Sequence, residues 1–156
     1  MAKYSYNQNG NLNDSGTQHV VTLVSTAAPN AGSAFRVYEI SMSGRGAASA
    51  VSVLGVNRPS AIGTGAITNQ VPEKFNPFSV ATAVQAATAW ATAAPTNSTN
   101  DILNPTWNNF GGIYRWVAPP DSEIYAIGQA AVANLDFKAR TGSGNSTGGH
   151  ILFEEL

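Results

Sequence analysis

The sequence predicts an all-β protein, a β-sandwich of about eight short antiparallel strands with little helix. Apolar residues alternate with polar ones over short runs, most clearly at residues 113–117 and 135–140. Turn-forming residues separate these runs, since the 156-residue chain contains 15 Gly and 8 Pro. Only residues 80–94 are rich in a strong helix former, alanine. Many short strands joined by turns favour two packed sheets, and we expect a jelly-roll-like sandwich.

The composition indicates one domain with a weakly charged surface. Apolar residues make up 43% of the chain, whereas charged residues make up 11%, under half of the usual ~25%. Ser, Thr, Asn and Gly must therefore supply the polar surface, which can pack against other protein copies with little desolvation of charge. The net charge of −1 gives no electrostatic reason to expect binding to nucleic acid or to an anionic membrane.

The chain also lacks several features of other protein classes. It contains no cysteine, so disulfides and thiolate chemistry are excluded. No apolar run approaches the ~18 residues of a membrane-spanning helix. The first ten residues have no apolar segment after their lysine, so we expect no secretory signal.

The first 18 residues depart from the pattern of alternating strands. They are rich in Asn, Gly and Ser and have too few apolar residues to fold alone. Two interpretations stay open: a frayed terminus, or an N-terminal arm that becomes ordered on a neighbouring subunit. In the second interpretation Lys3, Tyr4 and Tyr6 bind the partner. The single β-sandwich domain is then expected to comprise residues 19–156.

In the first half of the domain we expect strands at residues 19–27, 33–42 and 48–56. A turn signal at residues 43–46 predicts that the second and third of these form a hairpin. Residues 62–67 are weakly strand-like, and their glycines indicate a bulge or a close backbone approach. The prolines of residues 72–77 predict a loop, with Phe75 and Phe78 packing on the core.

The middle of the domain contains the ambiguous stretch. Residues 80–94 fit both a helix and a strand, and we predict a loop or a short helical turn through about residue 86, followed by a strand that ends at Thr92. Residues 94–109 are polar and rich in turn formers, so we expect a long connection anchored by Trp107.

Two short apolar runs, residues 113–117 and 123–127, flank a double proline. Proline cannot donate to a sheet ladder, so this pattern predicts a strand pair with a proline corner. Tyr114 and Trp116 alternate with Ile113, Arg115 and Val117, and we expect the two aromatic residues to face the core.

The remaining sequence predicts two more strands, at residues 129–139 and 150–156, and a flexible hairpin loop at residues 141–149. In the first strand Leu135, Phe137 and Ala139 alternate with Asp136, Lys138 and Arg140. The alternation predicts one apolar face and one solvated face.

Sequence signals of an enzyme are missing. His19 and His150 are far apart and have no metal-ligand spacing, so we expect no metal site and no cofactor. There is no G-x-S-x-G motif, and the glycines of residues 63–65 lack the lysine of a phosphate loop. The neighbouring carboxylates at residues 154–155 are expected to be solvated charges. We therefore expect no catalytic residues.

Several short motifs occur in a characteristic order: RVYEISMSG, LGVNRPSAIGTG, VPEKFNP, AWAT, GGIYRWVAPPDSEI and a terminal HILFEEL. Together they resemble a family of tailed-bacteriophage capsid decoration, or cement, proteins. The resemblance covers residues 35–156 and implies a jelly-roll-like sandwich that stabilises an icosahedral head, often as a trimer. It implies the major capsid protein and further copies of the chain as partners. It also implies synthesis in the host cytoplasm, a location on the capsid exterior, and no catalytic residues.

A second function stays open beside capsid decoration. β-Sandwiches also serve as glycan-binding modules of tail fibres or adhesins, and a fold does not establish a function. Trp90, Trp107 and Trp116 can stack on sugar rings. Trp107 is the best candidate, because its polar surroundings, NPTWNN, predict exposure.

Overall fold

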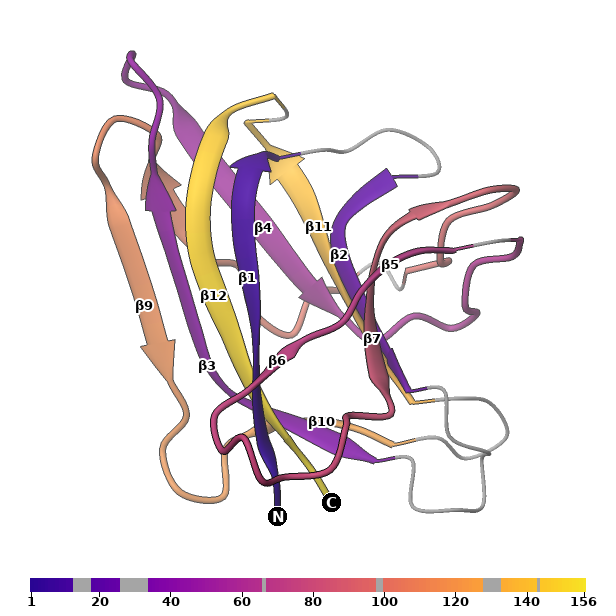
Figure 1. Cartoon of the computed structure of the whole chain (residues 1–156). Coiled ribbons are helices and arrows are strands. Elements are labelled where there is room, and N and C mark those ends of the chain that lie inside the picture. Colours follow the sequence, from indigo (N-terminus) through magenta and orange to yellow (C-terminus); the bar gives the residue numbers. More distant parts are fainter. Residues whose placement is uncertain (13–17, 26–33, 66, 98–99, 128–132, 143) are drawn as a thin grey trace.

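The computed structural model describes residues 1–12, 18–25, 34–65, 67–97, 100–127, 133–142 and 144–156. Within these residues twelve strands form two antiparallel sheets (Figure 1). The prediction of an all-β protein is confirmed. The strands outnumber the expectation because several are only two to four residues long. The described part of the chain contains no helix that could cross a membrane.

The two sheets are called A and B here. Sheet A contains β1 (Lys3–Asn11), β3 (Phe35–Gly44), β6 (Glu73–Lys74), β9 (Ile113–Val117), β10 (Ile124–Ala126) and β12 (Ser146–Glu155). Sheet B contains β2 (Gln18–Ser25), β4 (Val51–Asn57), β5 (Ile67–Gln70), β7 (Val84–Trp90), β8 (Thr106–Asn108) and β11 (Asn134–Thr141). The order is β10-β3-β12-β1-β6 in sheet A, with β9 also paired to β3, and β5-β7-β2-β11-β4-β8 in sheet B.

Consecutive strands mostly alternate between the two sheets (Figure 1). The links β1 to β2, β3 to β4, β6 to β7, β8 to β9 and β11 to β12 all pass from one sheet to the other. Sheet A contains the run β3-β12-β1-β6 and sheet B the run β4-β11-β2-β7, so the linked strands take corresponding places in the two sheets. The predicted hairpin of residues 33–42 and 48–56 is therefore wrong, because β3 and β4 lie in different sheets. The predicted hairpin loop at residues 141–149 is wrong for the same reason, since it joins β11 to β12.

The core lies between the sheets and is built from alternate residues of the long strands. Its largest fully buried side chains are Tyr4, Leu12, Val21, Leu23, Phe35, Ile40, Met42, Leu54, Leu135, Phe137, Ile151 and Phe153. The apolar face predicted for β11 is thus confirmed. Tyr4 stacks on Phe153 with their ring centroids 5.5 Å apart, so the first strand contributes directly to the core.

Residues 3–11 are part of the sandwich, not an arm outside it. β1 pairs with β12 from Lys3 to Asn11, and Tyr4 and Tyr6 are both buried. The arm prediction is wrong for these residues, and so is the domain boundary at residue 19. Tyr4 and Tyr6 are two positions apart, as on one face of a strand, but the polar residues around them did not predict a strand from the sequence. Residues 13–17 of the expected arm lie outside the described residues.

β9 and β10 do not form the predicted pair with each other. β9 pairs with Glu39–Ser43 and β10 pairs with Phe35–Val37, so both extend along one edge of β3. The double proline therefore belongs to a loop, residues 118–123, that leaves this edge and returns to it. The prediction for the aromatics of β9 holds, since Tyr114 and Trp116 are partly buried and pack against the core.

Three expectations for residues 62–94 have different outcomes. Of the two alternatives before β7, a loop or a helical turn, the described residues form the loop, and the strand runs from Val84 to Trp90. Phe75 and Phe78 are 58% and 94% exposed, so they do not pack on the core. The close backbone approach is confirmed at Gly63, where an added Cβ would lie 2.4 Å from Cδ2 of Trp90.

Several carboxylates predicted to be solvated are held by partners instead. Glu154 is buried and forms an ion pair with Arg36. Glu155 Oε1 accepts hydrogen bonds from the backbone N–H groups of Ala83 and Val84, at 2.7 and 3.1 Å. The two hydrogen bonds of Glu155 connect β12 to the segment that leads into β7.

Candidate functional site

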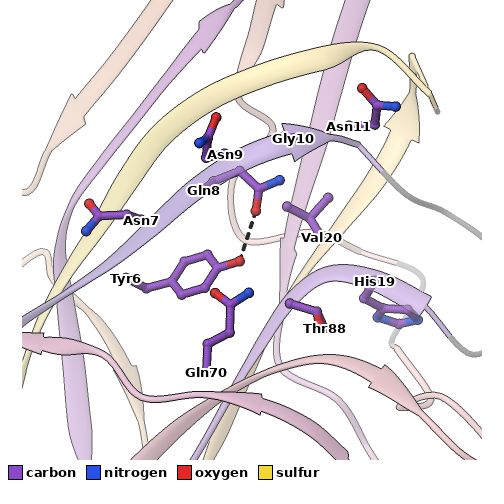
Figure 2. A pocket seen from close by; sticks show the side chains of 10 residues that line it. All are labelled: Tyr6, Asn7, Gln8, Asn9, Gly10, Asn11, His19, Val20, Gln70 and Thr88. Carbon is purple, nitrogen blue, oxygen red and sulfur yellow. Dashed lines mark hydrogen bonds between the residues drawn. The ribbon is translucent and has the colours of Figure 1, made fainter.

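A cavity of about 410 Å³ lies between the second half of β1 and sheet B (Figure 2). It is lined by Tyr6, Asn7, Gln8, Asn9, Gly10 and Asn11 of β1, His19 and Val20 of β2, Gln70 of β5 and Thr88 of β7. None of these residues is Lys, Arg, Asp or Glu. The volume falls within the ~300–1,000 Å³ typical of small-molecule sites, but the lining is far more polar than usual.

The strands of sheet B are irregular beside this cavity. The pairing of β2 with β7 places three residues of β2, 19–21, opposite the single residue Thr88. The pairing of β7 with β5 skips Thr88 as well. Bulges of this kind re-aim side chains and are common next to functional sites. Here the bulge places His19 and Val20 at the cavity wall, while Val20 and Val21 both pack in the core.

A buried hydrogen-bond network holds His19 in place. His19 Nδ1 lies 2.6 Å from the carboxylate of Asp136, which is 0% exposed. Thr22 Oγ1 and Asn97 Nδ2 donate to the same carboxylate, at 2.7 and 2.5 Å. The predicted solvated face of β11 is therefore wrong at Asp136. Because a buried carboxylate needs donors, these contacts stabilise the charge and fix the orientation of the imidazole ring.

The edge of β1 is open along the cavity. β6 pairs only with Tyr4 and Ser5, so from Tyr6 to Asn11 this edge has no strand partner among the described residues. The Tyr6 hydroxyl donates to Gln8 Oε1 at 2.9 Å. Burial raises the pKa of Tyr6 to about 12, so the hydroxyl keeps its proton at neutral pH.

A second feature is apolar and lies on the surface, at the two ends of sheet A. At the β9 end the exposed residues are Phe110, Ile113 and Val117. At the β6 end they are Val71, Phe75, Phe78 and Val80. These two groups are called the β9-end and β6-end apolar groups below. Ile113, for example, is 77% exposed, so the rest of the chain covers little of its side chain.

The four residues predicted to bind partners do not form one surface. Lys3 is exposed, with Nζ 5.2 Å from the ring centre of Tyr38. Tyr4 and Tyr6 are core residues of sheet A, and Trp107 is buried in sheet B at 4% exposure. The exposure predicted for Trp107 is wrong, because only its neighbours Thr106 and Asn108 face solvent, whereas its role as an anchor is confirmed.

The cavity and the pair formed by His19 and Asp136 were not predicted from the sequence. The available signals were the carboxamides alternating with other residues at positions 7–11 and a histidine inside an apolar strand. Among the described residues no three His, Asp or Glu side chains gather as a metal site requires. Comparisons with protein-family models, with curated proteins and with solved structures found no match to this chain.

Proposed function

We propose that this chain is a virion structural protein that decorates a capsid, binding the major capsid protein and its own copies to stabilise the head. The observation that carries the proposal is the pair of apolar groups at opposite ends of sheet A. Large apolar side chains gathered on a protein surface mark sites of protein–protein contact. A surface with 11% charged residues adds little desolvation cost to such a contact.

The position of the two groups supports contact between identical copies. β9 has no strand partner on its outer edge among the described residues, and β6 ends the same sheet on the other side. If the β9 end of one copy contacts the β6 end of the next, the contact is head-to-tail, and such contacts form a ring where the rotation between copies closes and an open filament where it does not. A trimer is the ring that we propose, with a jelly-roll-like sandwich as the protomer.

The alternative of a glycan-binding module that stacks sugars on tryptophans has less support. Trp90 and Trp107 are both buried, and only Trp116 is partly accessible. A sugar-stacking platform needs an exposed ring face, so this arrangement favours structural roles for the tryptophans.

The experiment that tests the proposal is electron microscopy of particles from the source of the sequence. The particles are labelled with gold-coupled antibody against the recombinant chain. Label distributed over the head surface is expected. Label confined to the tail, or particles without the chain, would overturn the proposal of capsid decoration.

A further inference from the structure

Within the described part of the chain, Gln8 and His19 each have one side-chain nitrogen that makes no hydrogen bond to another described side chain. Gln8 is buried and accepts from Tyr6 through Oε1, which leaves its Nε2 donor for an occupant. His19 is buried too, and with Nδ1 on Asp136 its Nε2 is left for an occupant. Neither nitrogen is among the fully buried atoms that lack a partner, so both can bond to water or to a ligand in the cavity. The cavity is therefore suited to a polar ligand.

The chemistry of the wall favours a neutral ligand with many hydroxyl groups. Two carboxamides, those of Gln8 and Gln70, face the cavity, whereas the side chains of Asn7, Asn9 and Asn11 lie on the opposite face of β1, as Figure 2 shows. A carboxamide presents a donor and an acceptor side by side, which matches adjacent hydroxyls on a sugar ring. A phosphate or carboxylate would find no Lys or Arg in this wall.

The surroundings of the cavity favour a compact ligand over an added strand. An extended peptide can pair with an open edge such as that of β1 from Tyr6 onwards. Residues 70–73 lead from β5 to β6, however, and face Ser5 and Tyr6 across a hollow of about 180 Å³. Glu73 then pairs with Ser5, so an added strand could not continue along β1 in that direction. A ligand of one or two sugar rings avoids this obstacle.

We propose that the cavity between β1 and sheet B is a saccharide-binding site. The carboxamides of Gln8 and Gln70 and the hydroxyl of Thr88 bind the hydroxyls of the ligand, and His19 Nε2 provides a further hydrogen bond. The site is separate from the apolar groups at the two ends of sheet A. The saccharide-binding site therefore does not depend on the decoration function, and an experiment can overturn either proposal without affecting the other.

The test is a nuclear magnetic resonance titration of the full chain, labelled with ¹⁵N. The probes are glucose, galactose, mannose, N-acetylglucosamine, maltose, lactose and cellobiose. Each is added to about 50 mM, well above a dissociation constant of ~1 mM, which corresponds to weak binding. At least one saccharide is expected to shift the signals of Tyr6 to Asn11 and of the Gln70 side chain. If none does, the cavity holds only water and the proposal is wrong. Shifts caused by an extended Asn/Ser peptide but by no saccharide would also overturn it.

Three variants locate the binding. Gln70→Ala and Thr88→Val remove polar groups that make no side-chain hydrogen bond within the described residues, so folding should be unaffected. Each is expected to weaken saccharide binding about tenfold. Asn69→Ala is the matched control, because Asn69 is adjacent in sequence but outside the cavity, where it donates to Gln85 at 2.7 Å. Affinities equal to wild type in both cavity variants would overturn the proposal, as would an equal loss in the control.

Discussion

His19 Nδ1 lies 2.6 Å from the carboxylate of Asp136, although 117 positions separate the two residues in the sequence. The contact connects adjacent strands of sheet B directly beside the cavity. Removing the carboxylate leaves the donors of His19, Thr22 and Asn97 without their acceptor. The effect of removing the carboxylate on the free energy of unfolding therefore measures most directly how much the network stabilises the fold.

We expect Asp136→Ala to lower the free energy of unfolding by about 3 kcal/mol, because it leaves buried donors unpaired. Chemical denaturation at pH 7 measures the loss. The control is Asp121→Asn, since Asp121 is exposed and its φ of 64° is a conformation that Asn tolerates. A loss no larger than the control's would show that the network does not stabilise the fold.

Glu39 predicts a pH-dependent contribution to stability. It accepts hydrogen bonds from Arg115 on β9, at 2.8 and 3.1 Å, and from His150 on β12, at 3.2 Å. The bond from Arg115, aided by His150 and opposed by burial, lowers the pKa of Glu39. A carboxylate whose pKa is lower in the folded state stabilises the protein above its ordinary pKa of about 4.3, and loses this effect as the pH falls further.

Glu39→Gln should therefore lower the free energy of unfolding at pH 7, by about 1 kcal/mol because Arg115 is largely exposed. The difference from wild type should shrink as the pH falls below ~4. Denaturation curves from pH 7 down to about pH 2, below the lowered pKa, measure this change, with Glu73→Gln on the exposed β6 as control. A difference that is constant with pH would contradict the role of the charge.

The burial of β1 predicts the effect of truncating Tyr4. Its ring stacks on Phe153, and its hydroxyl donates to the carbonyl of Val80 at 3.2 Å. Tyr4→Ala should lower the free energy of unfolding by about 3 kcal/mol, as for other buried aromatics. Lys3→Ala, at the exposed neighbouring position, should change it by less than about 0.5 kcal/mol. An unchanged melting temperature for Tyr4→Ala would restore the interpretation of an independent arm.

The periodicity of single strands was predictable from the sequence, whereas their partners were not. Leu135, Phe137 and Ala139 alternate with polar residues, and all three are buried as expected. The alternation wrongly predicted that Asp136 is exposed. Its side chain is covered by other parts of the chain, including Asn97, which lies 39 positions earlier in the sequence. Alternation of apolar and polar residues predicts which face of a strand is buried only where the other face is exposed to water.

The cavity could not be predicted for a related reason. It arises where pairing is interrupted, at the three residues of β2 opposite Thr88 and at the uncovered edge of β1. Register and strand order depend on contacts between distant segments, and short turn signals do not determine them. The turn at residues 43–46 misled in this way, since the chain crosses there to the other sheet.

Gly149 predicts a strong steric effect in the middle of sheet A. Its φ is +154°, and an added Cβ would lie 2.0 Å from the carbonyl oxygen of Ser41 on β3. Gly149→Ala should therefore push β3 and β12 apart and lower the melting temperature sharply. Gly144→Ala is the control, because its φ is also positive, at +87°, but nothing lies within 4 Å. Equal effects of the two variants would mean that strain alone, without the clash, explains the loss.

The central claim is that the apolar groups at the two ends of sheet A hold copies of the chain together. Sedimentation-velocity ultracentrifugation of wild type and of Ile113→Glu tests it most directly, because Ile113 is exposed and its replacement should leave the fold intact. At about 50 μM, a concentration at which micromolar contacts form, wild type should sediment as a trimer and the variant as a monomer. A monomeric wild type, or a trimer that the variant leaves unchanged, would contradict the claim.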